Sequence, residues 1–87
     1  MFIGNLTVRQ LEDKLSCSFS DEDYEFLSKH RTDDANFKAN NKFHIYEVPF
    51  TIIMGYRIKN EMLKLLNRYD WEIKCKEPLA LYVKDKE

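Results

Sequence analysis

The sequence predicts a small α+β fold: a mostly antiparallel sheet of three to four strands, with an N-terminal helical hairpin and one amphipathic helix packed on one face. Three observations predict it. Two short segments in the first third begin with helix-capping patterns, a later segment repeats its apolar residues at helical spacing, and two stretches alternate with a period of two. The expected order is α-α-β-(β)-α-β-β, within one domain over residues 1–87.

The first expected helix covers residues 8–16. Thr7 can accept a hydrogen bond from the free N–H groups of the first turn, and Gln10 can reach back to the backbone of Thr7. Leu6 and Leu11 occupy the two positions of a hydrophobic staple. These local signals predict where the helix begins, independently of its packing.

The second expected helix covers residues 21–30 and forms a hairpin or corner with the first. Ser20 is its cap. Acidic side chains fill its first turn and basic side chains its last turn, as the helix macrodipole favours. They are Asp21, Glu22 and Asp23 at the start and Lys29, His30 and Arg31 at the end.

A polar, aperiodic loop is expected over residues 32–41, and a strand over residues 42–48 follows it. Residues of this strand alternate between the two faces of the sheet, with Phe43 and Ile45 inward and His44 and Tyr46 outward. The inward pair is apolar and the outward pair is polar, so one face of the sheet is expected to be buried and the other open.

The third helix is the clearest element, because its apolar residues recur at helical spacing and its charged residues line the opposite face. The apolar residues are Ile58, Met62, Leu65, Leu66 and Tyr69, and the charged ones are Arg57, Glu61, Lys64 and Arg68. Residues 50–54, just before it, fit either a short buried strand or an apolar lead-in to the helix. Their β-branched content favours the strand.

The last two elements are expected to form a hairpin whose turn is Glu77-Pro78. In its first strand, Trp71, Ile73 and Cys75 are expected to point inward and Glu72, Lys74 and Lys76 outward. The complete inward set is Phe43, Ile45, Trp71, Ile73, Leu79, Leu81 and Val83 beneath Ile58, Met62 and Leu65.

The composition excludes several classes of protein. Hydrophobic residues at 44% and charged residues at 33% are typical of a folded chain rather than a disordered one. A net charge of −1 excludes a strongly basic nucleic-acid binder, and only 2 glycines exclude a Gly-rich phosphate loop. No apolar run approaches the roughly 20 residues of a membrane span, and the first residues lack the pattern of a signal peptide. We therefore expect no membrane association and a cytoplasmic location.

The chain offers few residues for metal or covalent chemistry. The soft ligands Cys17, His30, His44 and Cys75 are scattered without a close pair, so we expect no metal site. We expect no cofactor either, and no nucleophile elbow is present. The acidic pairs resemble solvated helix starts rather than carboxylates desolvated in a cleft. The sequence therefore predicts a protein that is not an enzyme.

Charge is distributed unevenly along the chain. Residues 1–36 carry a net charge of −4, whereas residues 37–87 carry +3. On the open sheet face, lysines and aromatic rings are expected to alternate and to form a partner-binding strip. Its members are Lys42, His44, Tyr46, Lys74, Lys76, Tyr82 and Lys84. Such a strip suits RNA or single-stranded DNA, although a merely solvated face has the same composition.

Two other surfaces are candidates for binding a protein. The acidic helix start offers an alternative partner-binding face, made of Asp21, Glu22, Asp23 and Glu25. In a domain this small, the apolar run over residues 45–54 need not all fit inside the core, and a remaining exposed patch would mark a protein interface or a homodimer seam, although simple burial in the core is the favoured interpretation.

The leading hypothesis is a small non-enzymatic binding protein that acts by docking on a macromolecular partner, most plausibly another protein. Lys, Asn, Ile, Phe and Tyr make up 33 of the 87 residues, a bias typical of A/T-rich genomes and of many small phage proteins. A phage or mobile-element modulator or inhibitor of a host factor or defence system, acting in the host cytoplasm, is the class we favour. The alternative is an RNA or single-stranded DNA binder that uses the open sheet face.

Overall fold

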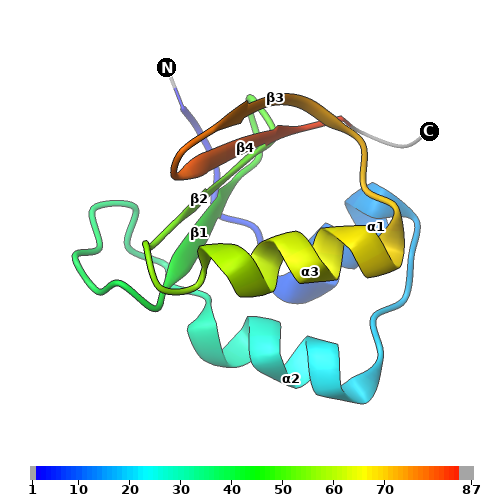
Figure 1. Cartoon of the computed structure of the whole chain (residues 1–87). Coiled ribbons are helices and arrows are strands. Elements are labelled where there is room, and N and C mark those ends of the chain that lie inside the picture. Colours follow the sequence, from blue (N-terminus) through cyan, green and yellow to red (C-terminus); the bar gives the residue numbers. More distant parts are fainter. Residues whose placement is uncertain (1, 85–87) are drawn as a thin grey trace.

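Three helices and four strands make up the computed structural model, which describes residues 2–84 (Figure 1). The predicted α+β class and the order of elements are confirmed. The elements are α1 (Val8–Leu15), α2 (Asp21–His30), β1 (Phe43–Tyr46), β2 (Thr51–Met54), α3 (Lys59–Tyr69), β3 (Ile73–Glu77) and β4 (Ala80–Val83). None of the helices within residues 2–84 has the length and apolar character needed to cross a bilayer.

The four strands form one antiparallel sheet in the order β1-β2-β4-β3. Residues 50–54, which the sequence left open, therefore contribute a central strand. Ile45 pairs with Ile52, and Ile52 pairs with Leu81, so these three side chains lie in one row on the same face. All three helices lie on this side of the sheet (Figure 1).

Local signals set the helix boundaries as predicted. Thr7 and Gln10 form the complete capping box at the start of α1. The hydroxyl of Ser20 accepts a hydrogen bond from the Asp23 N–H at the start of α2. Helix α1 ends where Ser16 adopts a left-handed conformation, and α3 ends the same way at Asp70.

The core lies between the helices and the inner sheet face. Leu11, Leu15 and Leu27 are fully buried and bring α1 and α2 against the apolar side of α3. Burying each such leucine stabilises the fold by about 1.5–3 kcal/mol. Leu79, expected to point inward, is 45% exposed, because it lies in the β3–β4 turn rather than in a strand.

A β-bulge in β3 reverses the predicted facing of its second half. Ile73 pairs with Val83, but the register shifts before Cys75, which pairs with Tyr82, and Lys76 then pairs with Leu81. Because paired residues share a face, Cys75 is exposed on the outer face and Lys76 lies on the helix side of the sheet. The expectations of an inward Cys75 and an outward Lys76 are therefore wrong.

The outer face of β1 is covered by the first residues of the chain, which we call the N-terminal strap (residues 2–6). The Ile3 N–H donates to the Val48 carbonyl at 2.7 Å, and the Leu6 N–H donates to the Ile45 carbonyl at 3.1 Å. The Phe2 ring packs against Tyr46, with ring centroids 5.0 Å apart. The strap therefore closes the free edge of β1 and shields part of the face that was expected to be open.

His44 is buried under the strap, with only 2% of its surface exposed. Its Nδ1 lies 3.0 Å from the Thr32 carbonyl oxygen, and its Nε2 lies 3.3 Å from the Gly4 carbonyl oxygen. The alternation of residues in β1 correctly places His44 on the outer face of the sheet. The expectation that it is exposed there is wrong, because the strap covers that part of the face.

Candidate docking surfaces

The predicted basic and aromatic strip is not one surface in the structure. His44 is buried and Lys76 lies on the other side of the sheet. Lys42 turns toward α2, where its ammonium donates to the Lys29 carbonyl at 3.0 Å. The structure therefore does not bring the seven predicted residues together.

The remaining members of the strip are divided as well. Lys74 lies within the bulge of β3, and Lys84 forms an ion pair with Glu72 at 3.3 Å. Tyr46 and Tyr82 do share the outer face, but the Phe2 ring lies against both, with centroids 5.0 and 6.2 Å away. The two rings are thus already packed against an aromatic side chain of the chain itself.

The predicted acidic face behaves differently, because one of its members holds two helices together. The Asp23 carboxylate accepts a hydrogen bond from the Tyr69 hydroxyl at 2.6 Å and two from the Arg68 guanidinium, at 2.8 and 3.3 Å. The Tyr69 oxygen in turn accepts a hydrogen bond from the Ser20 N–H at 2.8 Å. We call these four residues the helix link.

The helix link shifts the protonation equilibria of its charged members. Partial burial alone would raise the pKa of Asp23, but the hydrogen bonds from Tyr69 and Arg68 and the charge of Arg68 outweigh it and lower that pKa. The hydrogen bond to Asp23 raises the pKa of Arg68 in return. Asp23 is thus held as a carboxylate and is an element of structure rather than a poised acid or base.

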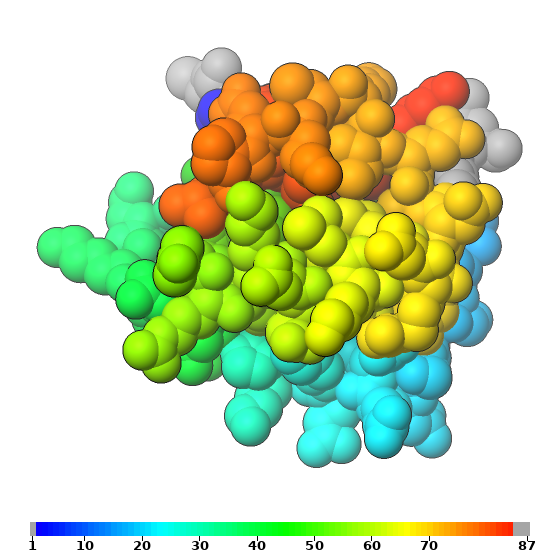
Figure 2. Space-filling view, in the orientation of Figure 1, coloured from blue at the N-terminus to red at the C-terminus, as the bar shows by residue number. Residues whose placement is uncertain are grey.

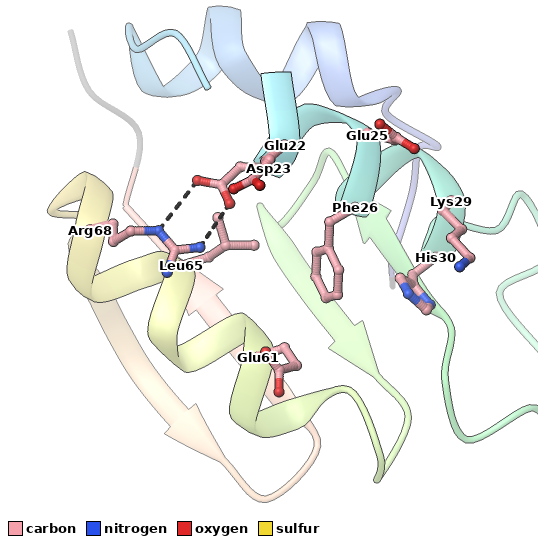
Figure 3. Close-up of a pocket in the computed structure, with 9 residues that line it drawn as sticks. All are labelled: Glu22, Asp23, Glu25, Phe26, Lys29, His30, Glu61, Leu65 and Arg68. Atoms are coloured by element: carbon pink, nitrogen blue, oxygen red, sulfur yellow. Dashed lines mark hydrogen bonds and ion pairs between the residues drawn. The ribbon is translucent and has the colours of Figure 1, made fainter. Parts of the chain in front are cut away.

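A groove of about 440 Å³ lies between α2 and α3, beside the helix link, and we call it the α2–α3 groove (Figure 3). The partly exposed Phe26 ring contributes most of its open apolar surface, Leu65 lines it with only 1% of its surface exposed, and charged side chains surround the two. The full lining is Glu22, Asp23, Glu25, Phe26, Lys29, His30, Glu61, Leu65 and Arg68. In Figure 2, the boundary between α3 (yellow) and α2 (cyan) crosses the lower half of the face in view.

The two walls of the groove run in opposite directions (Figure 1). Asp23, at the start of α2, meets Arg68, at the end of α3. A second hollow of about 520 Å³, which includes Ser20 and Tyr69, shares Glu22, Asp23 and Arg68 with the first. The concave surface therefore extends past the helix link along the length of both helices.

Carboxylates dominate the rim of the groove. Within residues 2–84, no ion pair neutralises Glu22, Glu25 or Glu61, and all three side chains are exposed. The lining holds one lysine, Lys29, and one arginine, Arg68, and Arg68 is paired with Asp23. The rim therefore carries a net negative charge.

His30 and Phe26 stiffen the far end of the groove. The His30 ring lies against the Phe26 ring with centroids 4.7 Å apart. Its Nδ1 lies 2.7 Å from the Asn41 carbonyl oxygen, which connects the end of α2 to the loop before β1. The Phe26 ring is therefore held in position while it remains partly open to solvent.

Three of the four residues of the predicted acidic face, Glu22, Asp23 and Glu25, line this groove, whereas Asp21 does not. The sequence places Glu61 and Arg68 on the charged face of the third helix and assigns Phe26 to no site. One signal was available, because Phe26 widens the apolar stripe of α2 beyond the buried Leu27. The contact of α2 with α3 is tertiary and has no local signature.

No protein-family model matches the sequence, and neither the curated proteins nor the solved structures compared with the chain gave a match. Among residues 2–84, no group of three or more His, Cys, Asp or Glu side chains is arranged to hold a metal ion. The α2–α3 groove is accordingly interpreted from its own geometry and charge.

Proposed function

We propose that this protein is a non-enzymatic binding protein that docks on another protein through the α2–α3 groove. The observation that carries the proposal is the partly exposed Phe26 ring, with the buried Leu65 beside it, inside a rim on which Glu22, Glu25 and Glu61 form no ion pair within residues 2–84. Protein interfaces commonly combine a buried aromatic anchor with a polar rim. The groove can accept such an anchor side chain from a partner and surround it with polar groups.

The energetics of the groove favour occupation by a side chain of a partner. Phe26 is half-buried in the free protein, so covering the rest of its ring contributes roughly 1 kcal/mol. The helix link holds α2 and α3 at a fixed spacing before any partner arrives. A preformed site lowers the entropy cost of binding, since the walls need not be ordered at that moment.

The same features disfavour a nucleic acid as the occupant of the groove. Phosphates bind where lysines and arginines neutralise them, whereas the rim here is made of carboxylates. The basic and aromatic strip on which the nucleic-acid hypothesis depended is split between two faces, and His44 within it is buried. A protein partner is therefore the proposal that the described surface supports better.

Photo-crosslinking from two matched positions tests the proposal. A benzophenone amino acid replaces Glu25 on the rim in one variant, and Glu77 on the outer sheet face in the other; both positions are exposed. Irradiation in cells that naturally carry the gene is expected to yield one discrete adduct from position 25 and none from position 77.

Three outcomes would contradict the proposal. The first is an adduct from position 77 alone, and the second is no adduct from either position. The third is a position-25 adduct whose mass equals two copies of this chain, which would assign the groove to a homodimer. Mass spectrometry of the adduct separates these outcomes, because it identifies the trapped protein.

A further inference from the structure

We infer that the partner places a short, cationic, amphipathic helix in the α2–α3 groove, with lysine or arginine side chains on the rim and one large apolar side chain on the floor. This inference rests on the proposed function and names the chemistry of the occupant. It follows from the charge of the rim, from the spacing of the lining residues and from the direction of the two walls.

Charge complementarity selects a cationic occupant. Glu22 lies on the α2 side of the groove and Glu61 on the α3 side, and Glu25, also a lining residue, projects from the side of α2 turned away from α3 (Figure 3). Asp23 and Arg68 neutralise each other. Lys29 opposes three glutamates that form no ion pair within residues 2–84 with a single charge, whereas the whole chain carries a net charge of only −1. The groove therefore concentrates negative charge, and it attracts cations within a Debye length of about 8 Å at physiological salt.

The spacing of the lining residues matches a helical occupant. On α2, Glu22, Phe26 and Lys29 are four and three residues apart, and on α3 the lining residues Glu61, Leu65 and Arg68 follow the same spacing. The α3 wall thus presents one helical ridge, and the α2 wall presents a similar ridge together with the neighbouring lining residues Asp23, Glu25 and His30. A third helix laid between two antiparallel ridges is the common way in which helical surfaces complete their packing.

The length of the walls limits the length of the occupant. Helix α2 has 10 residues and α3 has 11. At about 1.5 Å per residue, walls of this length accommodate roughly three helical turns of a partner. One apolar residue of such a segment meets Phe26 and Leu65, and residues three or four positions away reach the glutamates.

A synthetic peptide of twelve residues tests the inference. It carries leucines at helical spacing on one face and lysines on the other, and two control peptides have either a scrambled order or glutamates in place of the lysines. Fluorescence anisotropy measures their binding to the whole protein at low and high salt. The cationic amphipathic peptide is expected to bind at least tenfold more tightly than both controls, with affinity falling as salt rises.

Two charge-matched double variants separate the groove from net charge. Glu25→Lys with Glu61→Lys reverses the rim, whereas Glu47→Lys with Glu77→Lys makes the same charge change at exposed positions that do not line the groove. The rim variant is expected to lose at least tenfold in affinity for the cationic peptide and to gain affinity for the acidic one. The control variant is expected to change less than threefold. Circular dichroism verifies that both variants are folded.

The outcomes distinguish this inference from the proposed function. Equal losses in the two double variants, or no binding of the cationic peptide at millimolar concentration, would overturn the inference. If the position-25 adduct contains a partner segment that is neutral or acidic, the docking proposal stands and the cationic occupant is excluded. If no adduct forms at all, both fail. A partner segment rich in lysine or arginine, with leucine or an aromatic residue at helical spacing, supports both.

Discussion

Replacing Tyr69 by Phe tests whether the helix link holds the two groove walls together. The substitution removes one oxygen and keeps the ring, which packs edge-on against Phe19 with centroids 5.0 Å apart and planes at 85°. It therefore creates no large cavity. It deletes the hydrogen bond that the hydroxyl donates to the Asp23 carboxylate at 2.6 Å and the one it accepts from the Ser20 N–H at 2.8 Å.

The expected loss follows from the kinds of hydrogen bond removed. A bond between neutral groups contributes about 1 kcal/mol net, and a bond to a charged group somewhat more. Both hydrogen bonds are only partly shielded from water, because Ser20 is exposed. We therefore expect the two bonds together to contribute about 2 kcal/mol to the free energy of unfolding, near the low end of the range for such bonds. In a domain of this size, such a loss lowers the melting temperature by roughly 8–16 °C.

Urea and thermal unfolding of the Tyr69→Phe variant measure the effect, with Tyr56→Phe as the matched control. Tyr56 is 75% exposed, and its hydroxyl forms no hydrogen bond with other residues in the range 2–84. Its substitution is therefore expected to change the free energy of unfolding by less than about 0.5 kcal/mol. A loss below about 0.5 kcal/mol for Tyr69→Phe as well would refute the argument that the helix link stabilises the packing of α2 on α3.

Three further predictions concern pH, the N-terminal strap and one glycine. The pKa of Asp23 is lower in the folded state than its ordinary value of about 3.9, so the stabilisation by the Asp23 carboxylate is complete at neutral pH and declines as the pH falls below about 4. Asp23→Asn is expected to flatten the dependence of unfolding free energy on pH in that range. An unchanged slope would count against the helix link. His44→Ala removes the ring nitrogens that face the Thr32 and Gly4 carbonyl oxygens and opens a cavity, so we expect a loss of about 2–4 kcal/mol and faster hydrogen exchange at the Ile3 amide; unchanged exchange there would show that His44 does not anchor the strap. Gly55→Ala would place a Cβ in steric conflict with the Asn40 carbonyl oxygen, so we expect a loss of about 1–3 kcal/mol in urea unfolding, and a neutral effect would contradict the close packing of the loop over residues 32–41 on Gly55.

The elements of the fold could be predicted because their signals are local. The capping residues Thr7 and Ser20 and the helical spacing of Met62 and Leu65 act within one or two turns, so they require no knowledge of the rest of the chain. The alternation in β1 likewise gave the inward face, with Phe43 and Ile45 fully buried. These patterns were sufficient for the α+β class and for the order of the elements.

The errors arose where tertiary structure changes a local pattern. The bulge in β3 inserts one residue, which turns Cys75 outward and Lys76 inward while the sequence still alternates. The strap covers His44, and the contact of its Nε2 with the Gly4 carbonyl oxygen joins residues 40 positions apart in the sequence. Neither the bulge nor the strap contact has a signature in a single sequence. Together they remove Lys76 and His44 from the predicted binding strip.

The candidate site was half predictable for the same reason. The acidic start of α2 is visible in the sequence, although the macrodipole alone explains it. Its use in a groove depends on Arg68 and Tyr69, which lie 45 and 46 positions from Asp23 and become neighbours only when α3 packs beside α2. Phe26 acquires a role only in that context.

Amide chemical-shift mapping of the protein bound to the partner trapped at position 25 is the sharpest test that the α2–α3 groove is the docking site. The account predicts that the largest changes fall on α2 and α3 around Phe26, Glu61 and Leu65, and that the outer sheet face around Cys75 and Glu77 is unaffected. Changes concentrated on the outer sheet face, with α2 and α3 unperturbed, would contradict it.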